Sequence, residues 1–287
     1  MSVVRVALYQ AQSGIDPAAN APRLVDAVAE ASAGGAAMLF TPEMSNMLDR
    51  NRERALATAR REEEDDVLAA VRGAAAKAGM WVHLGSIALR GDGDKLVNRG
   101  FVIDAAGAIC ARYDKIHLFD VDLPTGESWR ESALYEAGHG AVVVAGTPLG
   151  TLGLMICYDL RFPALFERLS EAGAEVIAVP AAFTVPTGKA HWSVLLRARA
   201  IEAEVFVVAA AQAGRHEDGR DTYGHSLVVD PWGQVVAEMD AEPGLAFADI
   251  DLDRIAEVRT RIPVLAHRRD IARIDHRRDI ARIDPAG

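Results

Sequence analysis

Cys157 is the residue of this chain best placed for covalent chemistry. An apolar run over residues 151–156 predicts a buried strand, and the thiol follows it directly, ahead of the polar turn 158–161 and a predicted helix over 164–172. Reactive groups of α/β folds commonly lie at the carboxyl ends of strands. Peptide dipoles at a helix start favour the thiolate, the nucleophilic form of cysteine. An inert, buried cysteine is the alternative.

Two charged residues occupy positions comparable to that of Cys157. A nucleophilic cysteine needs a proton acceptor, a group that stabilises the oxyanion and an activated water. Glu43 follows a predicted strand over residues 36–40, and Lys115 lies where a predicted strand over 108–116 gives way to a loop. Isolated charges are usually exposed surface residues. Because these two adjoin apolar residues at strand ends, an unusual place for a charge without a role, they are candidates for a function.

The elements that must position these residues alternate between strand and helix along the chain. This order, with crossover-length spacing, predicts an α/β fold. Hairpins predicted within 100–116 and 227–238 indicate mixed sheets, and the apolar run 205–211 is typical of a strand buried on both faces. Further strands are expected at 3–9, 81–89, 141–145, 175–179 and 245–250, and helices at 21–33, 67–78, 191–204 and 252–262.

The totals favour one soluble domain. The 287 residues are 50% hydrophobic and 25% charged, and no linker composition interrupts residues 1–266. Residues 267–287 form a separate tail, because the nonapeptide 267–275 is repeated identically at 276–284. We assign this repeat no chemistry.

The net charge and the cysteine content limit which partners and which cellular compartment are compatible with this chain. A net charge of −10 argues against nucleic acid and anionic membrane surfaces. No apolar run approaches the roughly 18 residues of a membrane span. The two cysteines provide no disulfide framework and fit a reducing compartment, and residues 1–8 are too short for a signal peptide. We therefore expect a cytoplasmic protein. Cys110 lies in a predicted strand, and we expect it to be a small residue of the core.

Metal and nucleotide motifs are missing from the sequence. It contains no His-Glu-x-x-His, no paired Cys-x-x-Cys and no phosphate-binding Gly-rich lysine loop. We expect no metal and no cofactor.

Three segments resemble the nitrilase, or carbon-nitrogen hydrolase, superfamily. They are Phe-Thr-Pro-Glu43, Tyr-Asp-Lys115-Ile-His-Leu-Phe-Asp and Gly-Leu-Met-Ile-Cys157-Tyr-Asp-Leu-Arg-Phe-Pro. They occur in the family's order, and the likeness runs from about residue 3 to residue 269. The resemblance implies a four-layer α-β-β-α sandwich, a Glu-Lys-Cys triad and a homodimer or larger homo-oligomer.

The resemblance also implies catalytic roles. Glu43 would be the general base, Cys157 would form a thioester with the acyl group of an amide, and Lys115 would hold the oxyanion with the backbone N–H of Tyr158. A second acid is expected in the loop after the lysine. Glu131 matches that pattern, whereas nearby Glu127 does not.

Segments after Cys157 indicate which branch of the family the chain resembles. Residues 187–202, 207–216 and 223–233 resemble the amidase branch near the deaminated-glutathione amidases. This likeness implies cleavage of an amide between a 2-oxoglutarate unit and Cys-Gly. The neighbouring omega-amidase branch would release ammonia from 2-oxoglutaramate, and a nitrile could be attacked by the same groups.

An acidic substrate requires cations in the pocket of this acidic protein. Arg161 could bind a carboxylate with its planar guanidinium, or form a salt bridge at the helix start. Arg215 belongs to a polar loop that could cover the pocket or remain on the surface. Tyr158, Thr187 and His191 complete the residues expected to bind substrate.

Two hypotheses from other functional classes are also compatible with the sequence. A Cys-His hydrolase or acyltransferase would use His117 or His191 as its base, although His117 is more typical of a hydrogen-bonded structural histidine. A non-catalytic interaction protein would instead bind a partner through the repeated tail.

Overall fold

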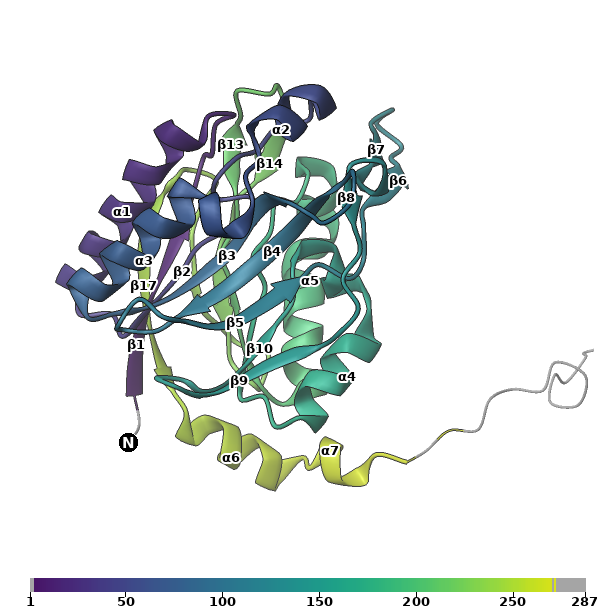
Figure 1. Ribbon diagram of the computed structural model, residues 1–287. Helices are drawn as coiled ribbons and strands as arrows, with labels where there is room; N and C mark the ends of the chain where they lie inside the picture. The colour runs from purple at the N-terminus through teal and green to yellow at the C-terminus, as the bar shows by residue number, and fades with distance from the viewer. Residues whose placement is uncertain (1–2, 270, 272–287) are drawn as a thin grey trace, which may run out of the picture.

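Two β-sheets form the centre of the molecule (Figure 1). The computed structural model describes residues 3–269 and residue 271. The first sheet has the order β17-β1-β2-β3-β4-β5, with β8 beside β4. Its strands β1 to β3 are parallel and the others on the main path pair antiparallel, so the sheet is mixed. Its strands are β1 (Val3–Gln10), β2 (Met38–Phe40), β3 (Trp81–Arg90), β4 (Leu96–Ile103), β5 (Ile109–Asp114), β8 (Tyr135–Glu136) and β17 (Gly244–Asp251).

The second sheet is also mixed. Its order is β16-β15-β12-β11-β10-β9, with β10, β11 and β12 parallel and the outer strands antiparallel. The pairing of β15 with β16 confirms the hairpin predicted around residue 232. The strands are β9 (Val142–Thr147), β10 (Gly150–Leu154), β11 (Val176–Ala178), β12 (Phe206–Ala209), β15 (Leu227–Val229) and β16 (Val235–Glu238).

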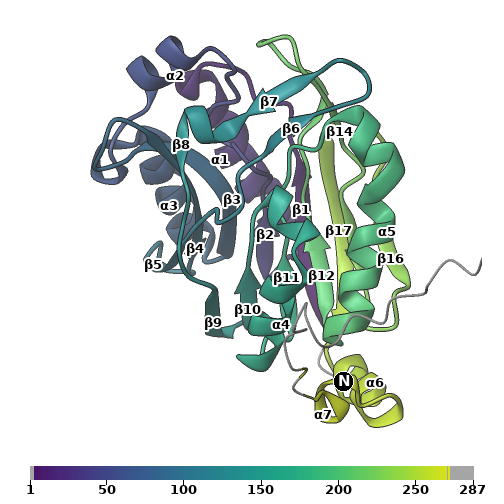
Figure 2. The same ribbon diagram turned by 90° about the vertical axis from the view of Figure 1, so that its right-hand side faces the viewer.

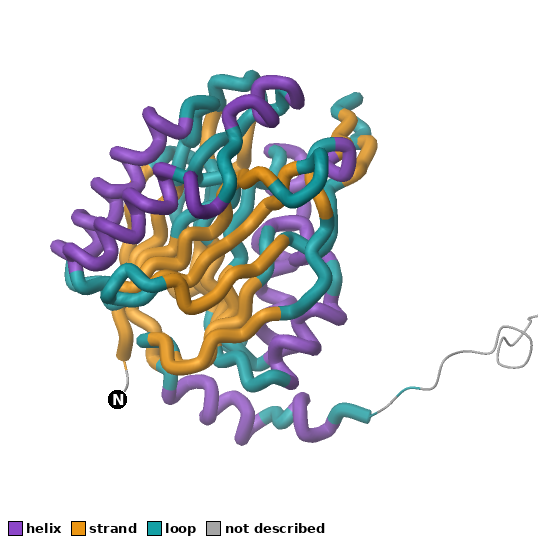
Figure 3. The backbone as a smooth tube through the Cα atoms, viewed as in Figure 1, coloured by secondary structure: helices purple, strands orange, loops and turns teal. Residues whose placement is uncertain are grey.

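Helices cover the outer face of each sheet, which confirms the predicted four-layer α-β-β-α sandwich. Helices α1 (Pro17–Ala33) and α3 (Asp66–Ala78) pack together on the first sheet, and α4 (Pro163–Glu171) and α5 (Val185–Ala203) lie on the second (Figures 2 and 3). Helices α2 (Arg52–Thr58), α6 (Asp253–Arg261) and α7 (Val264–His267) lie outside these layers. In the described part of the chain, no helix is both long and apolar enough to cross a membrane.

The apolar core fills the space between the sheets. Val6 and Leu8 of β1 belong to the same buried cluster as Leu152 and Leu154 of β10, whereas Ala7 joins the cluster beneath α1 and α3. Side chains of a strand alternate between its faces, so this division shows that β1 is buried on both sides. Such double burial gives the near-continuous apolar runs seen in the sequence.

Several sequence predictions differ from the structure. The loop expected after Lys115 contains regular structure: β6 (Asp120–Asp122) and β7 (Ser128–Arg130), which form a small hairpin, and the 3₁₀ turn Glu131–Ala133. Helix α5 begins at Val185 rather than at residue 191, because proline is tolerated in a helix's first turn. Cys110 is exposed on β5, so its predicted place in the core is wrong.

The tandem repeat lies outside the described residues except for 267–269 and 271. Helix α7 ends at His267, the first residue of the repeat. The division of the chain into residues 1–266 and 267–287 stays a prediction.

Candidate active site

A strained turn presents the Cys157 thiol. Cys157 begins the 3₁₀ segment Cys157–Arg161, shortly after β10, with a φ of +50°. A left-handed backbone costs a residue with a β-carbon of the order of 1–2 kcal/mol, so neighbouring contacts must hold it. The N–H of Cys157 donates to the carbonyl of Pro180 at 2.9 Å, and the Asp159 carboxylate accepts from the N–H of Ile156 at 2.9 Å. These bonds fix the direction of the thiol.

The first sheet brings Glu43 to the same place. Glu43 follows β2, is only 4% exposed, and its carboxylate is hydrogen-bonded to the Cys157 thiol. Its backbone carbonyl accepts a 2.8 Å hydrogen bond from Nε2 of Gln212. Thus β2 of one sheet and β10 of the other place a carboxylate against a thiol across the sandwich.

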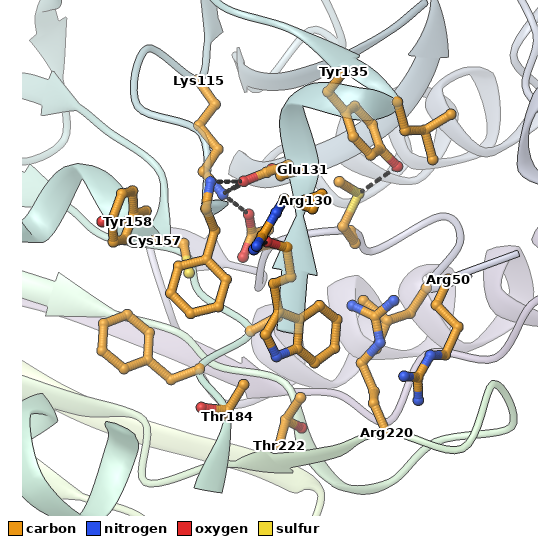
Figure 4. A pocket seen from close by; sticks show the side chains of 18 of the residues that line it. Arg50, Lys115, Arg130, Glu131, Tyr135, Cys157, Tyr158, Thr184, Arg220 and Thr222 are labelled. Atoms are coloured by element: carbon orange, nitrogen blue, oxygen red, sulfur yellow. Dashed lines mark hydrogen bonds and ion pairs between the residues drawn. The ribbon is translucent and has the colours of Figure 1, made fainter. Parts of the chain in front are cut away.

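Lys115 joins this pair to a second carboxylate. Its Nζ lies 2.9 Å from Oε1 of Glu43, and 2.9 and 2.8 Å from the two carboxylate oxygens of Glu131 (Figure 4). The ammonium is 2% exposed. Glu131 is held in turn by the backbone N–H of Phe119, at 2.6 Å. The structure therefore brings together all four residues predicted to act in catalysis.

The charges of this cluster shift one another's pKa values. Burial would lower the pKa of Lys115, but Glu131, Glu43 and Cys157 outweigh it and raise this pKa well above its usual value. Burial would raise the pKa of Glu43, but the Lys115 charge and hydrogen bonds from Lys115, Cys157 and Asn98 hold it below its usual value. Burial, together with the like charge of Glu43, raises the pKa of Glu131.

Cys157 differs from the sequence expectation of a thiolate. Burial and the negative charge of Glu43 raise the pKa of the thiol well above its usual value, although Lys115 opposes them. Cys157 also starts a short 3₁₀ turn rather than an α-helix, since α4 begins only at Pro163. The directions of these two pKa shifts favour a thiol on Cys157 beside a carboxylate on Glu43.

Asn98 is a functional candidate that the sequence reasoning missed. It lies in β4, is 1% exposed, and its Nδ2 donates to Glu43 Oε1 at 2.9 Å and, at 3.4 Å, to Glu131. The backbone carbonyl of Asn98 accepts from the backbone N–H of Lys115 at 3.0 Å. The available signal was an amide side chain within an apolar strand, where asparagine is normally depleted.

The cluster opens into a cavity of about 400 Å³. Of the residues predicted to bind substrate, Tyr158, Arg161 and Thr187 line it. His191 does not line it, although its Nδ1 lies 3.3 Å from Arg161. Arg215 does not line it either, but forms a 2.7 Å ion pair with Asp221, which does. The sequence did not single out four further arginines of the lining, which are Arg50, Arg52, Arg130 and Arg220.

His117 is structural, in line with the sequence expectation. Its Nδ1 lies 2.7 Å from the buried Asp159 carboxylate, and its ring stacks on Phe162 with centroids 3.5 Å apart. His117 is not part of the cavity lining. Asp159 also binds the turn at Cys157, so this pair supports the nucleophile's backbone. Among the described residues, no group of three or more His, Cys, Asp or Glu side chains could hold a metal ion.

Comparison with known proteins agrees with this geometry. The carbon-nitrogen hydrolase family model matches residues 5–260. The chain is 41% identical over 268 residues to the deaminated glutathione amidase of Rattus norvegicus, covering 92% of this chain and 82% of that protein. The NitFhit protein of C. elegans superposes with a TM-score of 0.87 at 38% identity, covering 93% of this chain and 65% of that longer one.

A third relative bears on the cysteine. The amidase of Nesterenkonia sp. AN1, a nitrilase-superfamily enzyme, superposes with a TM-score of 0.74 at 28% identity, over 91% of this chain and 98% of that one. In that structure, which is of a mutant with glutamine in place of one glutamate, the active-site cysteine carries acrylamide attached by Michael addition. The active-site cysteine of that relative is therefore a nucleophile. From its sequence match and its fold together, this chain belongs to the carbon-nitrogen hydrolase family and is an enzyme that hydrolyses amides.

Proposed function

We propose that this enzyme hydrolyses deaminated glutathione, the amide of a 2-oxoglutarate unit with Cys-Gly, through a thioester on Cys157. The observation that carries the proposal is that buried Glu43 contacts both Cys157 and Lys115, in the lining of a cavity that also contains several arginines. The rat relative named deaminated glutathione amidase supports the substrate.

The first half-reaction forms the thioester. Glu43 accepts the thiol proton while the sulfur of Cys157 attacks the amide carbonyl carbon, and the C–O π electrons move to oxygen. The Lys115 ammonium and the backbone N–H of Tyr158 stabilise this oxyanion. The oxyanion then collapses, the C–N bond breaks, and Glu43 returns the proton to the leaving nitrogen. Cys-Gly departs as an amine, and the acyl group remains on sulfur.

The second half-reaction consumes one water. Glu43, again a carboxylate, takes a proton from water as the oxygen attacks the thioester carbon. The C–S bond breaks and Glu43 protonates the departing sulfur, which restores the thiol. Because Lys115 keeps the pKa of Glu43 low, the carboxylate form that starts each half-reaction is the stable one. Glu131 positions the ammonium by binding it through both of its oxygens.

The cavity's charges suit an acidic amide. Arg161 lies beside the nucleophile, with its guanidinium 5.9 Å from the Tyr158 ring centroid and 5.4 Å from that of Phe183. Its side chain makes no ion pair with a described residue, so its charge is available for the 2-oxo acid carboxylate. Thr187, buried next to Thr184, would offer a hydroxyl.

The other candidate functions receive less support. A Cys-His mechanism lacks a base, because His117 is bound to Asp159 and His191 is exposed beside Arg161. Release of ammonia from 2-oxoglutaramate would leave the arginines remote from Cys157 without a ligand. A nitrile would leave them equally unused.

We also propose a cytoplasmic homodimer or larger homo-oligomer. Two free cysteines fit a reducing compartment. Apolar side chains are exposed on α5 and on the neighbouring hairpin of β15 and β16, namely Val194, Ile201, Trp232, Val235 and Val236. Exposed apolar clusters mark association surfaces. Light scattering on the purified protein should give a mass at least twice the 30.7 kDa of the chain, and a monomer would contradict this proposal.

The substrate is tested by assaying the enzyme with deaminated glutathione, 2-oxoglutaramate and a simple aliphatic nitrile side by side. We expect the highest kcat/KM with deaminated glutathione and no turnover by Cys157→Ser. A higher kcat/KM with 2-oxoglutaramate would reassign the enzyme to omega-amidase chemistry.

A further inference from the structure

A second group of cations lies in the cavity away from the nucleophile. In Figure 4, Arg50 and Arg220 lie together on the side of the pocket remote from Cys157 and Tyr158. We propose that Arg50, Arg220 and the ring of Trp129 form an anion subsite for the terminal carboxylate of the leaving group. The inference rests on the proposed function and adds to it the residues that select the leaving group of the amide.

Trp129 organises the two guanidinium groups. The guanidinium carbon of Arg220 lies 5.0 Å from the ring centroid of Trp129, and that of Arg50 lies 5.6 Å from it. Contact with an aromatic face holds a guanidinium in place. Its N–H donors, which lie in the plane of the guanidinium itself, stay free to bind a ligand. The indole therefore holds two cations close together despite their mutual repulsion.

Asp218, which does not line the cavity, sets the positions of both arginines. Its carboxylate, whose side chain has no exposed surface, accepts from Nε of Arg220 at 2.7 Å and from the backbone N–H of Arg50 at 3.0 Å. Asp218 neutralises Arg220 in part. No described carboxylate forms an ion pair with the side chain of Arg50. The subsite thus keeps an uncompensated positive charge, which an anionic ligand would balance.

A row of aromatic rings connects this subsite to the nucleophile. Tyr158, which follows Cys157, contacts Phe119 with centroids 5.1 Å apart, and Phe119 contacts Trp129 with centroids 6.3 Å apart. All three line the cavity. An extended two-residue leaving group spans about 7 Å, so Cys-Gly bonded to the acyl carbon at Cys157 would pass along these rings toward Trp129.

The two ends of the substrate match the two groups of arginines. Deaminated glutathione carries a carboxylate on its 2-oxo acid and another on its glycine, with the scissile amide between them. Arg161, beside Cys157, suits the first carboxylate, and Arg50 with Arg220 suits the second. An amide that releases only ammonia has nothing to place in the remote subsite. The subsite therefore selects amides whose leaving group ends in a carboxylate.

The test compares three substrates with the full-length enzyme and Arg50→Met. The substrates are deaminated glutathione, its analogue with a glycinamide terminus, and 2-oxoglutaramate. Wild-type enzyme should prefer the carboxylate over the carboxamide by about 10- to 100-fold in kcat/KM, as expected for charge-assisted hydrogen bonds. Arg50→Met should lose most of this preference while its kcat/KM for 2-oxoglutaramate stays near wild type. Arg60→Met, an exposed arginine outside the cavity lining, is the matched control.

Each outcome decides between the claims. Retention of the preference by Arg50→Met, or an equal loss on all three substrates, overturns the subsite. Wild-type enzyme that hydrolyses all three without preference overturns the subsite and leaves the amidase assignment intact. Wild-type enzyme that hydrolyses none of them overturns the proposed function, and the subsite with it. Arg50→Lys should restore part of the preference, since it returns the charge without the planar fork.

Discussion

Nζ of Lys115 lies 2.9 Å from Oε1 of Glu43, and both side chains are almost completely buried. This contact determines which partner carries the proton at rest. A buried carboxyl group alone would favour its neutral form. With the ammonium against it, Glu43 stays a carboxylate and can accept the proton of Cys157, whose own pKa is raised.

Replacing Lys115 by methionine should therefore raise the pKa of Glu43. Less of the carboxylate is then present at any given pH, so the acidic limb of the pH profile moves to higher pH. Alkylation of Cys157 by iodoacetamide reports this step without requiring oxyanion stabilisation. We expect a slower reaction at pH 7 and a displaced limb for Lys115→Met. Lys77→Met, which changes an exposed lysine of α3, is the control and should show the wild-type pH profile of alkylation. A wild-type profile for Lys115→Met would contradict the account.

Asn98 is expected to act as a positioning residue for Glu43. Asn98→Ala removes the 2.9 Å hydrogen bond to Glu43, so we expect kcat to fall about 10-fold with KM little changed. The acidic limb should also move to higher pH, by less than in Lys115→Met. Asn98→Asp keeps the shape but adds a third carboxylate to the cluster, and should be less active than Asn98→Ala. Equal pH profiles for wild type and Asn98→Ala would contradict a role in tuning Glu43.

His83 should make the protein's stability depend on pH. Burial lowers its pKa from 6.5 to about 3, and its Nδ1 has no hydrogen-bond partner. Between these values the unfolded chain binds a proton that the folded chain does not. The free energy of unfolding therefore falls as pH falls, by up to about 1.4 kcal/mol per pH unit.

Urea unfolding at pH 7 and pH 5 measures this effect. His83→Leu should lose less stability than wild type between the two pH values, by about 2 kcal/mol at most. His216, whose pKa is also lowered by burial, should leave the variant a residual dependence on pH. Identical losses in wild type and His83→Leu would rule out a contribution from His83.

Positions at strand ends could be predicted from the sequence, because the chain shows where an apolar run stops. Glu43 and Cys157 each follow such a run, Lys115 lies at the end of a predicted strand, and the structure gathers all three at one edge of the sandwich. Their proton distribution could not be predicted in the same way. It depends on how burial competes with the charges of Lys115 and Glu43, and that balance exists only in the packed molecule.

The cavity's remote half was hidden for a different reason. Arg50 and Arg220 lie far apart in the sequence, and they meet through Asp218 and Trp129. Each contact comes from a loop or a short hairpin, where no periodic pattern indicates a partner. Arg215 illustrates the opposite case, since its loop position suggested a pocket residue but it lies outside the cavity lining, paired with Asp221.

The central claim is that the sulfur of Cys157 carries the acyl group while the nitrogen leaves. Mass spectrometry of enzyme quenched with acid during turnover of deaminated glutathione tests this most directly. The account predicts an added 2-oxoglutaryl mass on the peptide that contains Cys157, and neither adduct nor turnover in Cys157→Ala. Undiminished turnover by Cys157→Ala, or an adduct on another residue, would contradict it.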